Sequence, residues 1–261
     1  QKRGFTVAHI KTDSIKIPDA TPEIIKFVTE YGKLYGYNFE HEATYDRMCL
    51  VNDAVYIARY ATVEKCHALY GKDYVEASKD VCKDNKKHPY DWAATGTQFQ
   101  VPYIFKTLFS KENIVFDDMC ETKSVTSALY LDMNEALAED EHDYHFIGRV
   151  GQFCPIKSGC GGGILLREME NKKTGEKGYA AATGSKGFRW LESEMVRQIG
   201  KQSDIDRAYY NNMVDDAVKA ISKYGDFERF VADEPYISEN TPPWFGAGEP
   251  YEDEATPFDK R

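Results

Sequence analysis

The residues of this chain best suited to chemistry lie near its start, between His9 and Ile17. Asp13 occupies a polar turn between two segments in which apolar residues alternate with small or polar ones. A period of two is typical of strands with one buried face, so we expect a hairpin with Asp13 at its tip. A carboxylate fixed in this way can hold a divalent cation. An aspartate in a turn also serves as a turn former that accepts hydrogen bonds from its own backbone.

The segments that follow this hairpin predict an α+β fold. Thr21 is a helix N-cap, Pro22 takes the first helical position, and Gly36 ends a run with apolar residues at helical spacing. Residues 39–45 and 48–60 then return to strand-like patterns. The order predicts a mainly antiparallel sheet with a helix packed on one side.

This order of parts resembles the end of the palm in family B DNA polymerases of the phage and plasmid branch. Lys11-Thr12-Asp13-Ser14 is similar to the family's Asp-Thr-Asp-Ser hairpin. The run from Asn52 to Ala58, ending Tyr56-Ile57-Ala58, is similar to the strand that carries the family's Lys-x-Tyr motif. The resemblance is specific over residues 5–60, and a looser similarity covers residues 90–135.

The resemblance implies roles for individual residues near the hairpin. Asp13 would be the catalytic ligand of Mg²⁺ or Mn²⁺, because the family's second aspartate binds both ions. Lys11 stands where the family has its first aspartate, so that ligand is absent here. Ala54 stands in place of the lysine of Lys-x-Tyr. Tyr56 would keep the contact with primer DNA, and Arg59 is the candidate for the cationic partner.

The implied activity is DNA-directed DNA synthesis, in which the primer 3′-hydroxyl attacks the α-phosphate of a deoxynucleoside triphosphate. Two-metal phosphoryl transfer needs a second carboxylate and basic groups that hold the triphosphate. In the family these groups precede the Lys-Thr-Asp-Ser turn, and only twelve residues precede Asp13 here. We therefore expect the chain to be a C-terminal polymerase part that acts on primer-template DNA together with an N-terminal portion or a partner chain.

The charge distribution points to one segment for contact with DNA. The chain has a net charge of −10, but residues 147–201 contain ten basic and five acidic side chains. This segment includes a predicted hairpin tip over residues 171–178 and a glycine-rich loop with Lys186 and Arg189. The two cations and the loop amides could meet DNA phosphates. A solvated hairpin with an ordinary charged tip accounts for the pattern equally well.

We predict three domains. Residues 1–62 form the palm-type sheet with its packed helix, residues 63–232 form a mixed helical and β-hairpin thumb with the basic hairpin at 147–190, and residues 233–261 form an acidic Pro/Gly-rich tail. Aromatic residues in the tail indicate docking on the thumb or on a replication partner. Helices are expected at four places in the thumb: residues 101–109, 125–137, 190–199 and 203–225.

Composition and cysteine spacing indicate a soluble protein of a reducing compartment. Hydrophobic residues make up 42% of the chain, and no run approaches the length of a membrane span. We expect no membrane contact and a cytoplasmic location, for instance in a phage-infected bacterial cell. The six cysteines show no Cys-x-x-Cys pair, so reduced thiols are expected. Four residues offer a second possible metal grouping: Cys154, Cys160, His142 and His145.

Two other functions fit the same sequence. Lys11 in place of an aspartate favours a non-catalytic nucleic-acid-binding protein derived from a polymerase domain. The acidic tail favours a structural or interaction protein whose likeness to a polymerase is accidental.

Overall fold

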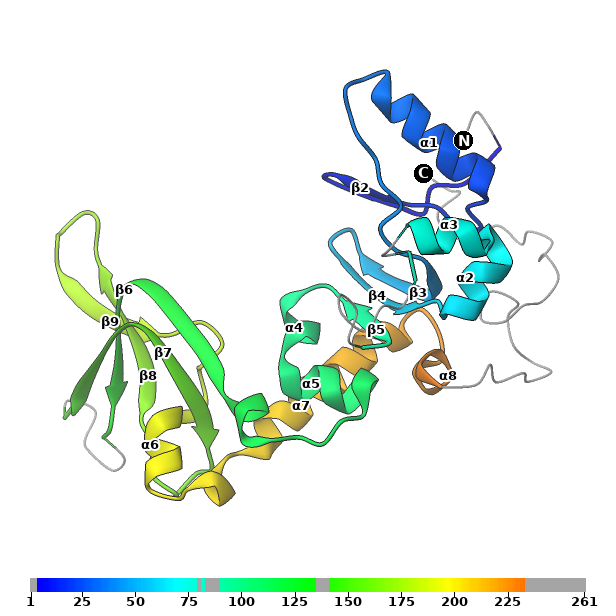
Figure 1. The fold of residues 1–261 in the computed structure, drawn as a ribbon. Helices are drawn as coiled ribbons and strands as arrows, with labels where there is room; N and C mark the ends of the chain where they lie inside the picture. The colour runs from blue at the N-terminus through cyan, green and yellow to red at the C-terminus, as the bar shows by residue number, and fades with distance from the viewer. Residues whose placement is uncertain (1–3, 79–80, 83–89, 135–140, 233–261) are drawn as a thin grey trace. The chain divides into compact units, whose positions relative to one another are not determined.

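The computed structural model describes residues 4–78, 81–82, 90–134 and 141–232. The chain divides into two compact units, residues 1–99 with 218–261 and residues 100–217. Both units combine helices with antiparallel sheets (Figure 1), so the predicted α+β class is confirmed. The predicted functional boundaries after residues 62 and 232 stay predictions.

The described part of the first unit contains two small antiparallel sheets and several helices. The strands are β1 (His9–Lys11) paired with β2 (Ser14–Lys16), and then β3 (Tyr45–Asn52), β4 (Val55–Tyr60) and β5 (Trp92–Ala94) in that spatial order. The helices are α1 (Pro22–Lys33), α2 (Val63–Tyr70), α3 (Lys72–Ala77) and α8 (Phe227–Val231). Two further helices cross the division between the units: α4 (Thr97–Gln100) and α7 (Arg207–Ser222).

The hairpin and the first helix form as predicted. In β1 and β2, Ile10 pairs with Ile15. Thr21 caps α1 by accepting a hydrogen bond from the backbone N–H of Ile24 at 3.4 Å. The chain leaves the helix through Gly36, whose φ of +81° lies in the left-handed region that glycine enters without steric cost.

The packing of α1 leaves part of its apolar face uncovered by described residues. The ring of Phe27 contacts that of Phe5, and Gly32 allows Phe39 to approach the helix backbone. Three apolar side chains of the helix and its C-terminal end are nevertheless 48–77% exposed: Tyr31, Leu34 and Tyr35. The strand predicted over residues 39–45 is wrong except at Tyr45, where β3 begins.

The second unit is built on a five-stranded antiparallel sheet. In spatial order the strands are β10 (Arg189–Glu192), β7 (Tyr144–Ile156), β6 (Glu121–Asp132), β8 (Ile164–Glu170) and β9 (Lys177–Ala181). The short helices are α5 (Pro102–Phe105), η1 (Lys106–Ser110), η2 (Phe116–Met119), α6 (Ser193–Gln198) and η3 (Gln202–Asp204). The predicted hairpin with its tip at 171–178 is confirmed, because Glu170 pairs with Lys177.

One face of this sheet carries the core of the second unit. Trp190, Phe153 and Leu165 are fully buried in it. Tyr210 from α7 joins the same core, where its ring stacks on that of Tyr103 at a centroid distance of 4.8 Å. Large apolar side chains from three strands and two helices therefore meet on a single side of the sheet.

The helix predicted over residues 125–137 is wrong, because residues 121–132 form β6 and residues 135–137 lie outside the described residues. This strand pairs with β7 on one side and β8 on the other. The double pairing buries Leu129 and Leu131, two residues apart, on one face at 0% and 2% exposure. Tertiary pairing thus overrides the apparent helical spacing.

The other three predicted thumb helices are present in the structure with changed bounds. Residues 101–109 are mainly helical, as α5 and η1, and the helix predicted over 203–225 appears as α7 after the single turn η3. The helix predicted over 190–199 starts late, since Trp190 belongs to β10 and only Ser193–Gln198 is helical. The predicted acidic tail, residues 233–261, lies outside the described residues.

Candidate functional site

Asp13 lies exposed at the tip of the β1–β2 hairpin. Lys11 pairs with Ser14, so Thr12 and Asp13 alone connect the strands. Thr12 has a φ of 41°, and a positive φ at the first central residue is a feature of the turns that match the twist of two-residue hairpins. The carboxylate is therefore presented to solvent from a short, paired turn, as the sequence predicts.

This hairpin is fastened to the turn between β3 and β4. Nε2 of His9, a residue with only 6% exposure, donates a hydrogen bond to the backbone carbonyl of Asp53 at 2.9 Å. Nζ of Lys11 donates to the carbonyl of Ala54 at 3.2 Å. The side chain of Asn52 shapes this turn by accepting the backbone N–H groups of Ala54 and Val55. Lys11 therefore helps to position the hairpin against this turn.

Tyr56 lies next to the hairpin as a result. Its ring contacts the buried ring of His9 at a centroid distance of 6.0 Å, and the ammonium of Lys16 lies 5.5 Å from the centroid of the Tyr56 ring. On another side Tyr56 contacts Tyr45, and burial raises the pKa of Tyr45, with Tyr56 and Tyr60 adding to the effect. The structure therefore brings Tyr56 and the Asp13 hairpin together.

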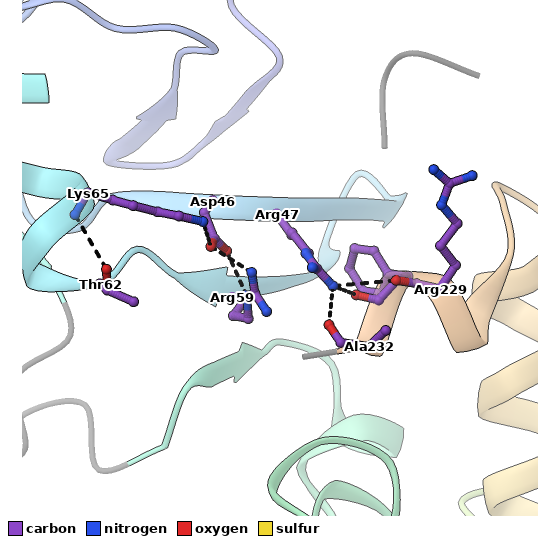
Figure 2. Close-up of polar contacts among 8 residues, drawn as sticks. Asp46, Arg47, Arg59, Thr62, Lys65, Arg229 and Ala232 are labelled. Carbon is purple, nitrogen blue, oxygen red and sulfur yellow. Dashed lines mark hydrogen bonds and ion pairs between the residues drawn. The ribbon is translucent and has the colours of Figure 1, made fainter. Parts of the chain in front are cut away.

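Arg59 is held in an internal ion pair. Its Nε and Nη2 donate to the two carboxylate oxygens of Asp46 at 2.8 and 2.7 Å, a bidentate arrangement shown in Figure 2. Nζ of Lys65 donates to the same carboxylate at 2.6 Å. Burial acts to raise the pKa of Asp46, but the hydrogen bonds from Arg59 and Lys65 outweigh it and hold the pKa below its ordinary value.

The neighbouring residue on β3, Arg47, secures the end of α8. Nη1 of Arg47 donates to the carbonyls of Phe230 and Ala232 at 2.9 and 2.6 Å (Figure 2). Carbonyls at a helix C-terminus lack partners within the helix, and a cation is favoured there. Trp92 on β5 packs against Phe230 as well. Adjacent residues of one strand, Asp46 and Arg47, thus stabilise two different junctions.

The two cations predicted in the second unit differ in their surroundings. Lys186 is exposed in the turn between β9 and β10. The guanidinium of Arg189 is half-buried and donates to the carbonyl of Gly162 at 2.7 and 3.0 Å and to that of Asn134 at 3.1 Å. Gly162 has a φ of +84°, and a Cβ there would lie 3.1 Å from the Trp190 carbonyl oxygen. The glycine-rich run therefore lies close against β10, and Arg189 holds it there.

The described residues contain no group of three or more His, Cys, Asp and Glu side chains placed to hold a metal ion. Asp13 is therefore not part of such a group, and the cysteine and histidine grouping around Cys154 does not form among these residues. Sγ of Cys154 lies 3.5 Å from that of Cys120 in the core, and His142 pairs with Asp132. All six cysteines are free thiols.

Sequence patterns did not identify the aromatic side chains on the other face of the second sheet. Tyr130 of β6, Tyr144 and Phe146 of β7, and Tyr179 of β9 contact one another and point away from the core. The signal was present as the alternation of Tyr144 and Phe146 at a spacing of two. Tyr130 was missed because residues 125–137 were predicted as a helix, whereas Tyr130 lies in the strand β6.

No protein-family model, curated protein or solved structure matches the chain. Among the helices of the described residues, none is long and apolar enough to cross a membrane.

Proposed function

We propose that this chain is the C-terminal palm and thumb part of a DNA-directed DNA polymerase, related to the phage and plasmid branch of family B. One observation carries the proposal. The hairpin with Asp13 and the strand with Tyr56 are more than forty residues apart in sequence, and the His9 and Lys11 hydrogen bonds hold them together. The resemblance requires this proximity, because both segments act at the primer end. The proposed location of the protein is the cytoplasm, for instance of a phage-infected bacterial cell.

Asp13 suits the role of one ligand of a catalytic Mg²⁺ or Mn²⁺. Its carboxylate is exposed, and the paired strands on both sides limit its movement. Bound metal would stabilise the charge that develops on the phosphate of the incoming deoxynucleoside triphosphate. The chain's own residues would position the hairpin through His9 and Lys11 and place the Tyr56 ring against the primer strand. Lys16 lies against that ring and adds positive charge on the same side.

The proposal requires a second portion that supplies the other carboxylate and the triphosphate clamp. The apolar residues at the C-terminal end of α1 offer a surface for it, because Leu34 and Tyr35, which follow the helix, are 77% and 65% exposed. Exposed apolar side chains that cluster on a protein surface favour contact with another protein. The N-terminal portion or partner chain of the polymerase is the proposed occupant.

The test uses the native polypeptide or complex that contains this chain, purified by a tag on the chain. Primer extension is measured with Mg²⁺ for the wild type, for Asp13→Asn and for Asp19→Asn. Asp19 is a matched control, since it is also an exposed aspartate with a positive φ of 50° in a turn of the same unit. We expect Asp13→Asn to abolish primer extension while binding of the primer-template persists. Asp19→Asn should retain both extension and binding. Full extension by Asp13→Asn would refute the proposal.

The exposed aromatic residues of the second sheet favour a second candidate function, a non-catalytic nucleic-acid-binding protein. In that case neither aspartate substitution changes any activity of the purified complex. Oligonucleotide binding without detectable primer extension in the wild type would support this candidate over the polymerase.

A further inference from the structure

The face of the second sheet that points away from the core carries a cluster of aromatic rings. We define the aromatic face as Tyr130, Tyr144, Phe146 and Tyr179. Tyr144, Phe146 and Tyr179 are 36%, 66% and 44% exposed. The rings come from three strands, β6, β7 and β9, and therefore stand on a hydrogen-bonded sheet instead of a loop.

The rings are held in a defined arrangement. Tyr144 and Tyr179 stack at a centroid distance of 4.4 Å with 27° between their planes, and His142 stacks on Tyr144 at 4.9 Å and 18°. Tyr130 meets Phe146 and Tyr179 edge to face at 5.5 and 5.1 Å. Three ring planes thus form a partly exposed stack that a further flat ring could extend.

The charges around the aromatic face are compatible with an anionic ligand. Two carboxylates beside the rings are paired, Glu168 with Nζ of Lys177 at 2.7 Å and Asp132 with Nδ1 of His142 at 2.8 Å, while the exposed Glu170 lies opposite Lys177 in the β8–β9 register. The hairpin tip that leads into the strand of Tyr179 adds the exposed Lys172 and Lys173. These residues, apart from Asp132 and His142, belong to segment 147–201, whose net charge is +5 in a chain of −10.

We propose that the aromatic face binds single-stranded nucleic acid, with bases stacked on Tyr179 and Phe146 and phosphates near Lys172 and Lys173. Sequence-independent single-strand binding combines stacking on aromatic rings with a cationic path for the backbone, and both parts are present here. Bases within a duplex are already stacked on one another, so the rings select unpaired nucleotides. The proposal rests on the second sheet alone and stands whether or not the polymerase assignment holds.

The first experiment measures the affinity of the full chain for a fluorescein-labelled oligothymidine by fluorescence anisotropy at low salt. An abasic oligonucleotide of the same length serves as the comparison, because it keeps the phosphates and lacks the bases. Stacking predicts that Tyr179→Ala weakens oligothymidine binding about tenfold and leaves abasic binding unchanged. Tyr179→Phe keeps the ring and should retain the affinity.

The matched control is Tyr37→Ala, which removes a tyrosine with 65% exposure from the first unit and should change neither affinity. Circular dichroism checks that each variant is folded. Replacing Lys172 and Lys173 by Gln should weaken binding of both oligonucleotides. It should also reduce the slope of log affinity against log salt concentration by about 0.7 for each phosphate that the protein no longer neutralises.

Two results would overturn the proposal. The first is an equal loss for Tyr179→Ala on oligothymidine and on the abasic strand, because the ring would then not contact bases. The second is no binding of oligothymidine by the folded wild type at low salt, which would leave a protein as the occupant of the aromatic face. Neither result depends on Asp13, so the failure of this proposal is distinguishable from failure of the polymerase assignment.

Discussion

The ion pair between Arg59 and Asp46 gives a sharp prediction about stability. The two side chains are only 16% and 9% exposed, and two charge-assisted hydrogen bonds join them. Asp46→Asn keeps the shape of the side chain but removes the negative charge that faces the Arg59 guanidinium in a poorly solvated position. Removing one partner of a buried pair costs about 3–5 kcal/mol, and the remaining exposure of Arg59 places the expected loss at about 3 kcal/mol.

Lys65 is the matched comparison within the same cluster. Its Nζ lies only 2.6 Å from the Asp46 carboxylate, yet the side chain is 54% exposed. Exposed pairs contribute about 0.2–1 kcal/mol because water screens them, so Lys65→Met should cost about 0.5 kcal/mol. The shorter distance is therefore expected to matter less than the burial.

Hydrogen exchange detected by mass spectrometry is the appropriate assay, because it reports the stability of β3 and β4 separately from that of the second unit. Asp46→Asn should shorten the protection of peptides from residues 45–60 by about two orders of magnitude, which corresponds to about 3 kcal/mol. Protection in residues 144–170 should not change. A loss below about 1 kcal/mol for Asp46→Asn, or an equal loss for Lys65→Met, would refute the reasoning from burial.

Two further predictions concern the first unit. Burial lowers the pKa of His41 in the folded protein, so as the pH falls the unfolded chain binds a proton at this residue before the folded protein does. The free energy of unfolding should therefore decrease as the pH drops below about 6.5, by at most about 1.4 kcal/mol per pH unit. Urea unfolding at pH 7.5 and 5.5 should show a smaller decrease for His41→Asn than for the wild type. At Gly32 a Cβ would lie 2.5 Å from the ring of Phe39, so Gly32→Ala should lower stability by about 1 kcal/mol in thermal unfolding. A gain of about 1 kcal/mol, as at an open helical glycine, would contradict this packing argument.

Sequence patterns predicted local structure well where the signal was itself local. Thr21, Pro22 and Gly36 fix the ends of α1 through contacts within a few residues, and the structure confirms them. The strand β6 depends instead on pairing with β7 and β8, which begin further along the chain. No window around residue 125 contains that information, so its apolar spacing was misinterpreted as a helix.

The same distinction separates the candidate site residues. Asp13 and Lys186 are exposed in turns, where a residue's type and its turn are enough to predict access to a ligand. Arg59 and Arg189 have the residue type that a phosphate contact needs, but each guanidinium is bound to distant acceptors, Asp46 for one and Gly162 for the other. A pattern of cations predicts which side chains could meet DNA and does not reveal which of them the fold already uses.

This difference sets the order in which the cations should be tested for DNA contact. Arg59 would have to leave its buried carboxylate before it could bind a phosphate, at a cost of about 3 kcal/mol, comparable to that expected for Asp46→Asn. Lys16 and Lys172 need no such rearrangement, because Lys16 lies over the face of a tyrosine ring and Lys172 is exposed at a hairpin tip. If Arg59→Lys abolishes DNA binding while the protection of β3 and β4 is kept, Arg59 contacts DNA in spite of that cost. If DNA binding and the protection of β3 and β4 decline together, the role of Arg59 is to hold the strand that carries Tyr56.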